Sequence, residues 1–188
     1  LKSASEILRD SNNSEQRIKL LSILSHDVLR IERLITDYSQ MLKDEVALSK
    51  EMMKKINIEP IIQYVVEDYN NIQRVKKNIK INYQNDGKTQ YNIKGIENRI
   101  EQIIANLLDN SISFSKEGGN IFVSVSSTLD NNILVKISDE GQGFKEKDTT
   151  RIFNRFYSNR PDKFGEHSGL GLNIVKNLVD VHEGEILG

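Results

Sequence analysis

Polar side chains and glycines meet at the end of one apolar run of the sequence. Asp139 follows NNILVKIS, and Gly141 and Gly143 come directly after it in DEGQGF. Glycine removes the side chain where a chain must turn or where another molecule approaches closely. Asp139 would then be a fixed hydrogen-bond acceptor at the mouth of a pocket. A tight turn after a strand explains the same three residues equally well.

Two carboxamide side chains form a second cluster. Asn106 and Asn110 lie four residues apart, next to Asp109, so they share one face if this segment is a helix. Oxygen ligands of this kind suit Mg²⁺, which takes few protein oxygens and completes its coordination with phosphates and water. On spacing alone, both residues could equally be solvent-facing positions of an amphipathic helix.

Arginines and a glycine-led helix start form the third and fourth clusters. RIFNRFYSNRP interleaves Arg151, Arg155 and Arg160 with aromatic residues, and the forked donors of arginine suit phosphate oxygens. In HSGLGLNIV, Gly169 and Gly171 open a predicted helix, whose free N–H groups would face an anion. Taken singly, the first pattern fits an ordinary charged surface helix, and a GxG before a helix is common.

Together and in this order, the four clusters predict an ATP·Mg²⁺ site. A carboxylate at a strand end can accept from the exocyclic amine of adenine, while the arginines and the helix start can hold the triphosphate. The net charge is −1, from 26 basic and 27 acidic residues, so no global field attracts nucleic acid or an anionic membrane. The absence of cysteine excludes disulfides and thiolate metal sites.

One long helix precedes these clusters. Residues 15 to about 53 contain no Gly or Pro, and their apolar positions follow a heptad seam that requires helical partners. SNNS at 11–14 predicts a turn, and 1–9 reads as the end of an earlier helix. The result is a helical hairpin with a truncated first arm, which we expect to form a homodimeric four-helix bundle. The seam consists of Leu21, Leu24, Val28, Ile31, Ile35, Tyr38 and Leu42.

From Ile56 onward the sequence predicts an α/β two-layer sandwich with a mixed sheet, so the whole chain is α+β. INIEP is expected to be extended up to Pro60, and a helix is expected from 96 to 114. The other expected elements are a helix IIQYVVEDYNNIQRVKK, strands IKINYQ and QYNIK around the turn NDGK, an antiparallel hairpin of IFVSVSS and ILVKIS, a helix GLGLNIVKNLVDVH and a last strand from GEIL.

The ordered motifs resemble those of the sensor histidine kinases, whose ATP-binding fold is shared with gyrase, Hsp90 and MutL. NLLDNS resembles the N box, DEGQGF the G1 box, IFNRFY the F box and HSGLGLNIVKNLVDVHEGEI the G2 box. SHDVLRIERLITD resembles the second helix of the dimerisation and phosphotransfer domain, especially in extracytoplasmic stimulus-sensing kinases. The resemblance implies that 1–55 is part of that helical hairpin and that 56–188 is the ATP-binding catalytic domain.

The resemblance also implies roles for individual residues. Asn110 is then expected to be the main Mg²⁺ ligand, with Asn106 beside it, and Asp139 is expected to be the residue that recognises adenine. Ser113 and Ser158 stand where many family members carry basic residues, so Arg160 is expected to take over one phosphate contact. The implied catalytic set is Asn110, Arg155 and Arg160. The implied cofactor-binding set is Asn106, Asn110, Asp139, Gly141, Gly143, Arg155, Ser168, Gly169, Leu170 and Gly171.

No histidine of the sequence is assigned as the phosphoacceptor. His26 is followed by an acid, as in the family motif, but no turn or proline follows it within 27–56 and it falls at an outer heptad position. An exposed helix histidine is the favoured interpretation. LKSASEIL resembles the residues just after the acceptor motif, so the acceptor is expected immediately upstream of Leu1. His167 lies in a charged loop and His182 at a helix end, and neither has a neighbouring residue in the sequence that indicates a role as a nucleophile.

Three functions remain open on the sequence. The leading hypothesis is a sensor histidine kinase that passes the γ-phosphoryl of ATP to a histidine, for relay to the receiver domain of a response regulator. A gyrase-, Hsp90- or MutL-type ATPase is disfavoured, because Asn106 stands where those enzymes carry the Glu that activates water. The third is a nucleotide-binding dimer scaffold or degenerate kinase.

The partners expected are a second copy of the chain and a response regulator, which could dock near Arg30 and Arg33. No nucleic-acid partner is expected. The apolar runs are short and interrupted by charge, so a cytoplasmic portion is expected, with inner-membrane spans only in missing upstream segments of a parent protein.

Overall fold

The computed structural model describes residues 14–48, 51–76, 78–88, 90–144, 149–155, 157 and 169–188. The chain divides into two units, and most of the described residues belong to an α/β unit formed by 50–155 and 171–188. Helix α2 belongs to the other unit. No described helix is long and apolar enough to cross a membrane.

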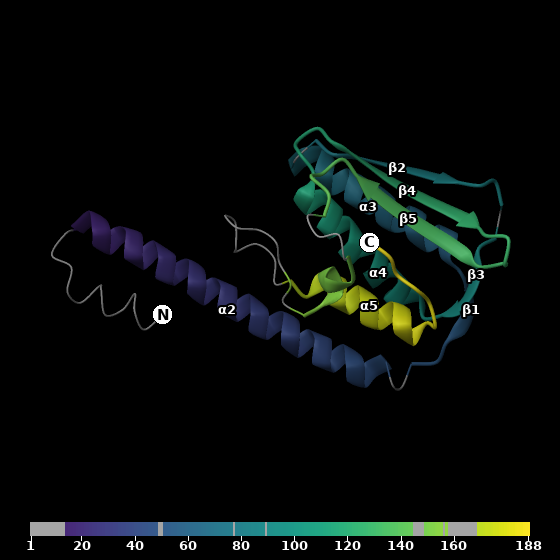
Figure 1. Cartoon of the computed structure of the whole chain (residues 1–188), viewed down its shortest axis with the longest axis horizontal. Helices are drawn as coiled ribbons and strands as arrows, with labels where there is room; N and C mark the ends of the chain where they lie inside the picture. The colour runs from purple at the N-terminus through teal and green to yellow at the C-terminus, as the bar shows by residue number, and fades with distance from the viewer. Residues whose placement is uncertain are drawn as a thin grey trace. The chain divides into compact units, whose positions relative to one another are not determined.

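Helix α2 spans Ser14–Leu48, so it begins where the sequence predicted and ends before residue 53 (Figure 1). The apolar seam along it is largely uncovered within one chain. The seam residues classed as exposed are Leu21, Val28, Ile31, Ile35 and Tyr38. Most helical stability in proteins comes from packing an apolar face, so α2 lacks that contribution along this seam in a single chain. The predicted first arm over 1–9 and the side chains of His26, Arg30, Arg33 and Leu42 lie outside the described residues.

In the part of the α/β unit that the structure describes, there are two small sheets and three α-helices (Figure 1). One sheet pairs β1 with β3 in antiparallel fashion, and the other has the order β2-β4-β5, with β2 parallel and β5 antiparallel to β4. The strands are β1 (Lys54–Asn57), β2 (Lys80–Asn85), β3 (Asn92–Gly95), β4 (Asn120–Ser127) and β5 (Ile133–Asp139). The helices are α3 (Ile58–Lys76), α4 (Glu97–Phe114), the 3₁₀ helix η1 (Thr149–Phe153) and α5 (Gly171–Val181). This confirms the predicted α+β class with a mixed sheet.

The core lies between the three-stranded sheet and the helices. Strand β4 alternates, with Ile121, Val123 and Val125 buried and Phe122 exposed, so one face of the sheet is covered. Leu108 of α4 is 0% exposed on the helix side of this core. The predicted helix over 96–114 and the predicted β4–β5 hairpin are therefore confirmed.

The two strands that flank NDGK, as predicted, belong to different sheets, because β2 pairs with β4 and β3 pairs with β1. Two local predictions were wrong. The extended segment INIEP ends at Asn57, whose side-chain oxygen accepts from the backbone N–H of Glu59 at 3.3 Å, and α3 begins there. Pro60 is tolerated because it lies in the first turn of that helix. The segment GEIL is not a strand. Its first residue, Gly184, instead caps the end of α5, because its backbone N–H donates to the Val179 carbonyl oxygen at 2.9 Å.

Candidate functional site

The two asparagines of α4 lie on a partly buried face of that helix. The apolar stripe of α4 faces the core, and both Asn106 and Asn110 are half-buried beside it. They are therefore not simply solvent-facing positions of an amphipathic helix. A Cβ atom added to Gly171 would lie 4.0 Å from Asn106 Oδ1, which places this amide oxygen at the first residue of α5. Helix α4 thus presents an oxygen ligand at the start of a second helix.

Asp109 has a different neighbour. Burial, followed by the charge of the Asp109 carboxylate, raises the pKa of the Tyr69 hydroxyl, and the two side chains are hydrogen-bonded. The Tyr69 hydroxyl also lies 3.4 Å from the Ala105 carbonyl oxygen. Since Tyr69 belongs to α3, Asp109 is engaged with that helix.

Asp139 ends β5 in a turn that its own side chain stabilises. Its Oδ1 accepts from the backbone N–H of Gly141 at 2.8 Å. A Cβ at Gly141 would lie 2.6 Å from this oxygen and 3.0 Å from the carbonyl oxygen of Phe114, the last residue of α4. Gly143 has φ 68°, the left-handed region that favours glycine. The two glycines are needed for different reasons, close approach at Gly141 and backbone conformation at Gly143.

The F-box segment is anchored by its apolar residues. Ile152 of η1 is 4% exposed, whereas Arg151 and Arg155 are exposed. The Asn173 side-chain amide donates to the Phe153 carbonyl at 2.9 Å and so ties η1 to α5. Arg155 therefore lies two residues beyond a segment that is fixed to the glycine-led helix. The predicted residues Arg160 and Ser168, and also His167, lie outside the described residues.

The glycine-led helix is present, and it begins at Gly171, after the predicted start at Gly169. Gly169 has φ 71°, Leu170 is 0% exposed and α5 starts at Gly171. The first N–H groups of a helix have no partner within it, and the helix dipole makes this end positive. Within the α/β unit, the structure brings Gly171 next to Asn106 and brings the end of α4 next to the Asp139 turn.

These groups fit ATP better than a metal ion alone. The described residues contain no group of three or more His, Asp or Glu side chains that could hold a metal by themselves. The donor set is instead amide oxygens, one exposed carboxylate and backbone N–H groups. A side chain at Gly171 would fill the space before the Asn106 amide oxygen. Mg²⁺ held by few protein oxygens and by phosphate matches this set.

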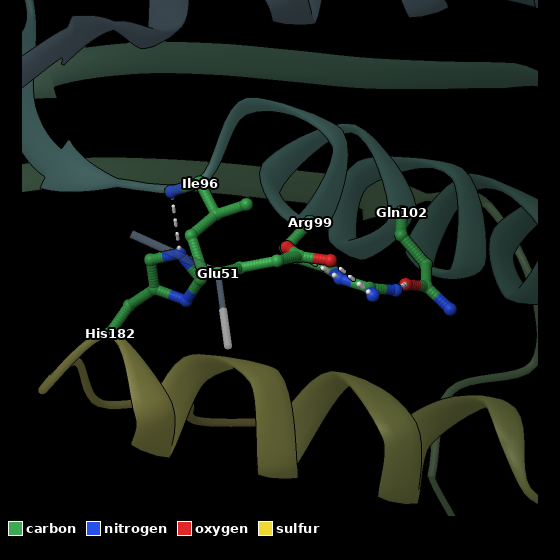
Figure 2. Close-up of polar contacts among 5 residues, drawn as sticks. All are labelled: Glu51, Ile96, Arg99, Gln102 and His182. Carbon is green, nitrogen blue, oxygen red and sulfur yellow. Dashed lines mark hydrogen bonds and ion pairs between the residues drawn. The ribbon is translucent and has the colours of Figure 1, made fainter. Parts of the chain in front are cut away.

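A partly buried ion pair at the start of α4 was missed by the sequence analysis. Arg99 is 8% exposed, and its guanidinium binds the Glu51 carboxylate through Nη2–Oε1 at 2.8 Å and Nε–Oε2 at 3.3 Å (Figure 2). Arg99 Nη1 also donates to Gln102 Oε1 at 3.1 Å. The only sequence signal was an arginine on the partly buried side of an amphipathic helix, and Glu51 lay in a segment predicted to be helical.

His182 was expected to lie at a helix end, and the structure shows its contacts there. Its Nδ1 lies 2.7 Å from the Leu178 carbonyl oxygen and therefore donates to it. Its Nε2 accepts from the backbone N–H of Ile96 at 3.1 Å (Figure 2). Ile96 is the N-cap residue of α4 and has no side-chain cap of its own. His182 therefore links the end of α5 to the start of α4.

The chain is similar in sequence to known proteins. The model of the histidine kinase-, DNA gyrase B-, and HSP90-like ATPase family matches residues 95–187. The chain is 35% identical to the sensor protein ChvG of Agrobacterium fabrum over 99% of its own length, and it spans 32% of that relative.

Two solved structures share the fold. Full-length ShkA in complex with AMPPNP has a TM-score of 0.64 at 22% identity, covering 96% of this chain and 38% of that one. ThkA in complex with the response regulator TrrA has a TM-score of 0.62 at 22% identity, covering 96% of this chain and 50% of that one.

Proposed function

This chain belongs, through residues 95–187, to the histidine kinase-, DNA gyrase B-, and HSP90-like ATPases, and we propose that it is the ATP-binding catalytic portion of a sensor histidine kinase. The parent protein would transfer the γ-phosphoryl group of ATP to a histidine for relay to a response-regulator aspartate. The observation that carries this proposal is the convergence of α4 on the Asp139 turn at one point and on the start of α5 at another.

Each part of the site has a proposed task. Asp139 accepts from the exocyclic amine of adenine, because its carboxylate is exposed and already oriented by Gly141 N–H. Asn110, with Asn106 beside it, holds Mg²⁺, which neutralises charge on the phosphates when it is bound. The N–H groups at the start of α5 bind phosphate oxygens. Arg155 and Arg160 add charge-assisted hydrogen bonds to the phosphates. Gly143, Ser168, Gly169 and Leu170 complete the proposed nucleotide lining.

The transfer itself requires little covalent chemistry from these residues. Positioning of the γ-phosphoryl group and electrostatic stabilisation account for most of the catalysis in phosphoryl transfer. We propose that the acceptor histidine lies outside these residues in the parent protein, because LKSASEIL resembles the residues that follow the family's acceptor motif. Hydrolysis as the main task is disfavoured, since Asn106 cannot act as a general base for water.

Helix α2 supplies the proposed dimer contact. Its exposed heptad seam is an apolar face that a second copy of the chain could cover in a four-helix bundle. We propose a response-regulator receiver domain as the second partner, by analogy with the complex of ThkA with TrrA. The chain would act as a cytoplasmic portion of its parent protein.

The proposal is tested by binding measurements on the whole chain. ATP affinity is measured by calorimetry with and without Mg²⁺, for the wild type, Asn110→Ala and the control Asn98→Ala, which changes an exposed asparagine of the same helix. We expect Mg²⁺ to tighten ATP binding in the wild type and the control but not in Asn110→Ala. The proposal would be contradicted if the wild type bound no ATP, or if its ATP affinity were the same with and without Mg²⁺.

A further inference from the structure

Two contacts from distant parts of the chain converge on the first turn of α4. Arg99 binds Glu51, which lies in the segment 51–53 that leads into β1, and the Ile96 N–H binds His182 at the end of α5 (Figure 2). Figure 2 shows the Glu51 carboxylate and the Arg99 guanidinium pointing toward each other, with Gln102 on the far side of the guanidinium. The start of α4 is therefore held by groups 48 and 86 residues away in sequence.

Helices α4 and α5 lie antiparallel along each other. Ile96, at the start of α4, contacts the end of α5, whereas Asn106, ten residues later, faces Gly171 at the start of α5. Gly95 allows this approach, because a Cβ there would lie 3.0 Å from His182 Cδ2. The start of α4 and the later turn that carries Asn106 therefore both contact the same helix, α5.

Arg99 lies on the same stripe of α4 as the proposed magnesium ligands. Asn106 and Asn110 follow it by seven and eleven residues, and at 3.6 residues per turn these positions fall within about 20° of Arg99 around the helix. A rotation or axial shift of α4 at Arg99 therefore moves both asparagines in the same sense. Because a helix is stiff over this length, the shift is not absorbed between them.

The ion pair has the properties of a specific link. Arg99 makes two hydrogen bonds to one carboxylate, and this bidentate geometry restricts the orientation of both side chains. The Arg99 side chain is 9% exposed and that of Glu51 28%, so solvent screens the pair less than an exposed one. The exposed pair Lys176–Asp180 on α5, at 2.6 Å, provides the contrast within the same unit.

We propose that Glu51 and Arg99 are positioning residues for the nucleotide site. The pair fixes α4 to the segment that joins α2 to β1 in the chain, and so sets Asn106 and Asn110 relative to the start of α5. A displacement of the 51–53 segment would change nucleotide affinity through this contact. This inference rests on the proposed function, because it concerns the same ATP·Mg²⁺ site.

The experiment separates positioning from simple stability. Glu51→Gln, Arg99→Lys, the double variant and the control Asp180→Asn are prepared in the whole chain. Thermal unfolding without nucleotide gives Tm, and calorimetry with the ATP analogue AMPPNP plus Mg²⁺, well below each Tm, gives Kd. We expect each single variant to weaken binding about 5- to 30-fold, within the usual range of coupling between sites. The double variant should lose no more than the worse single one, because both act through one contact. Asp180→Asn should change Kd less than twofold.

Each outcome has a distinct meaning. Lower Tm with unchanged Kd in both single variants would overturn the inference, because the pair would then be only structural. Losses that add in the double variant would also overturn it. A wild type that does not bind AMPPNP would refute the proposed function instead. If Glu51→Gln does not fold, Arg99→Lys, which keeps the positive charge but loses the forked donor, decides the question alone.

Discussion

Replacing Gly141 by alanine is expected to disable the proposed adenine contact without unfolding the domain. The new Cβ would lie 2.6 Å from Asp139 Oδ1 and 3.0 Å from the Phe114 carbonyl oxygen, whereas ordinary van der Waals contact begins at 3.4 Å. The Phe114 oxygen is part of the backbone and cannot rotate away. The Asp139 carboxylate can, and it would then lose its bond to the backbone N–H of residue 141. Rotation of Asp139 therefore relieves the contact at 2.6 Å and moves the proposed adenine acceptor, while the contact with the Phe114 oxygen requires the backbone to shift by a few tenths of an ångström.

The size of the effect follows from loss of the proposed hydrogen bond between the adenine amine and the Asp139 carboxylate. A hydrogen bond to a charged group contributes about 1.5–3 kcal/mol. At about 1.4 kcal/mol per factor of ten, its loss weakens ATP binding about 10- to 150-fold. Calorimetric titration of Gly141→Ala with ATP plus Mg²⁺ measures this change.

Gly87→Ala is the matched control. Gly87 has φ 84° and nothing within 4 Å of an added Cβ, so the substitution introduces strain without a clash. It follows Asp86, which accepts from Ser127 N–H at the end of β4, whereas Asp139 pairs with Ile121 at the start of that strand. Left-handed conformation costs alanine about 1–2 kcal/mol, which should lower Tm by several degrees and leave ATP affinity unchanged. If Gly141→Ala bound ATP as tightly as the wild type, the steric reasoning about Asp139 would be refuted.

Three further substitutions test other parts of the account. Leu108→Ala should lower the free energy of unfolding by about 2–5 kcal/mol in denaturant titration, because it leaves a cavity in the core; a loss below 1 kcal/mol would contradict the described packing. Burial and the nearby Glu59 carboxylate raise the pKa of Tyr83 to about 12, so stability present below pH 10 should fall as the pH rises toward 12. Tyr83→Phe should reduce that fall. If the free energy of unfolding decreased equally with pH in the variant and the wild type between pH 10 and 12, this assignment to Tyr83 would be wrong. Val28→Lys puts a charge on the exposed α2 seam and should shift sedimentation from dimer to monomer, whereas an unchanged dimer would place the contact elsewhere.

Local periodicity was sufficient to predict much of the fold. Helix α4 and the β4–β5 hairpin depend on neighbouring residues, and their patterns of 3.6 and 2 residues are visible in one sequence. The parallel pairing of β2 with β4 was not predictable in this way, because it depends on burial of a shared face between segments far apart in the chain. The same limit applies to the strands around NDGK, whose partners β4 and β1 are not their neighbours across that turn.

The candidate site was predictable in its residue types but not in its contacts. Asn106, Asp139 and Gly171 were identified from motifs, and the structure adds that Gly171 faces Asn106. Glu51 and Arg99 were missed because their contact spans 48 residues and neither residue belongs to a phosphate-binding motif. A charged residue on an amphipathic helix is normally solvated, so its burial becomes visible only with its partner.

Nucleotide selectivity tests the central claim most directly. The dissociation constants of ATP and GTP, each with Mg²⁺, would be measured for the wild type and for Asp139→Asn. An adenine acceptor at Asp139 predicts that the wild type binds ATP more tightly than GTP and that Asp139→Asn loses at least about tenfold in ATP affinity. Equal affinity of the wild type for ATP and GTP, or wild-type ATP affinity in Asp139→Asn, would contradict the account.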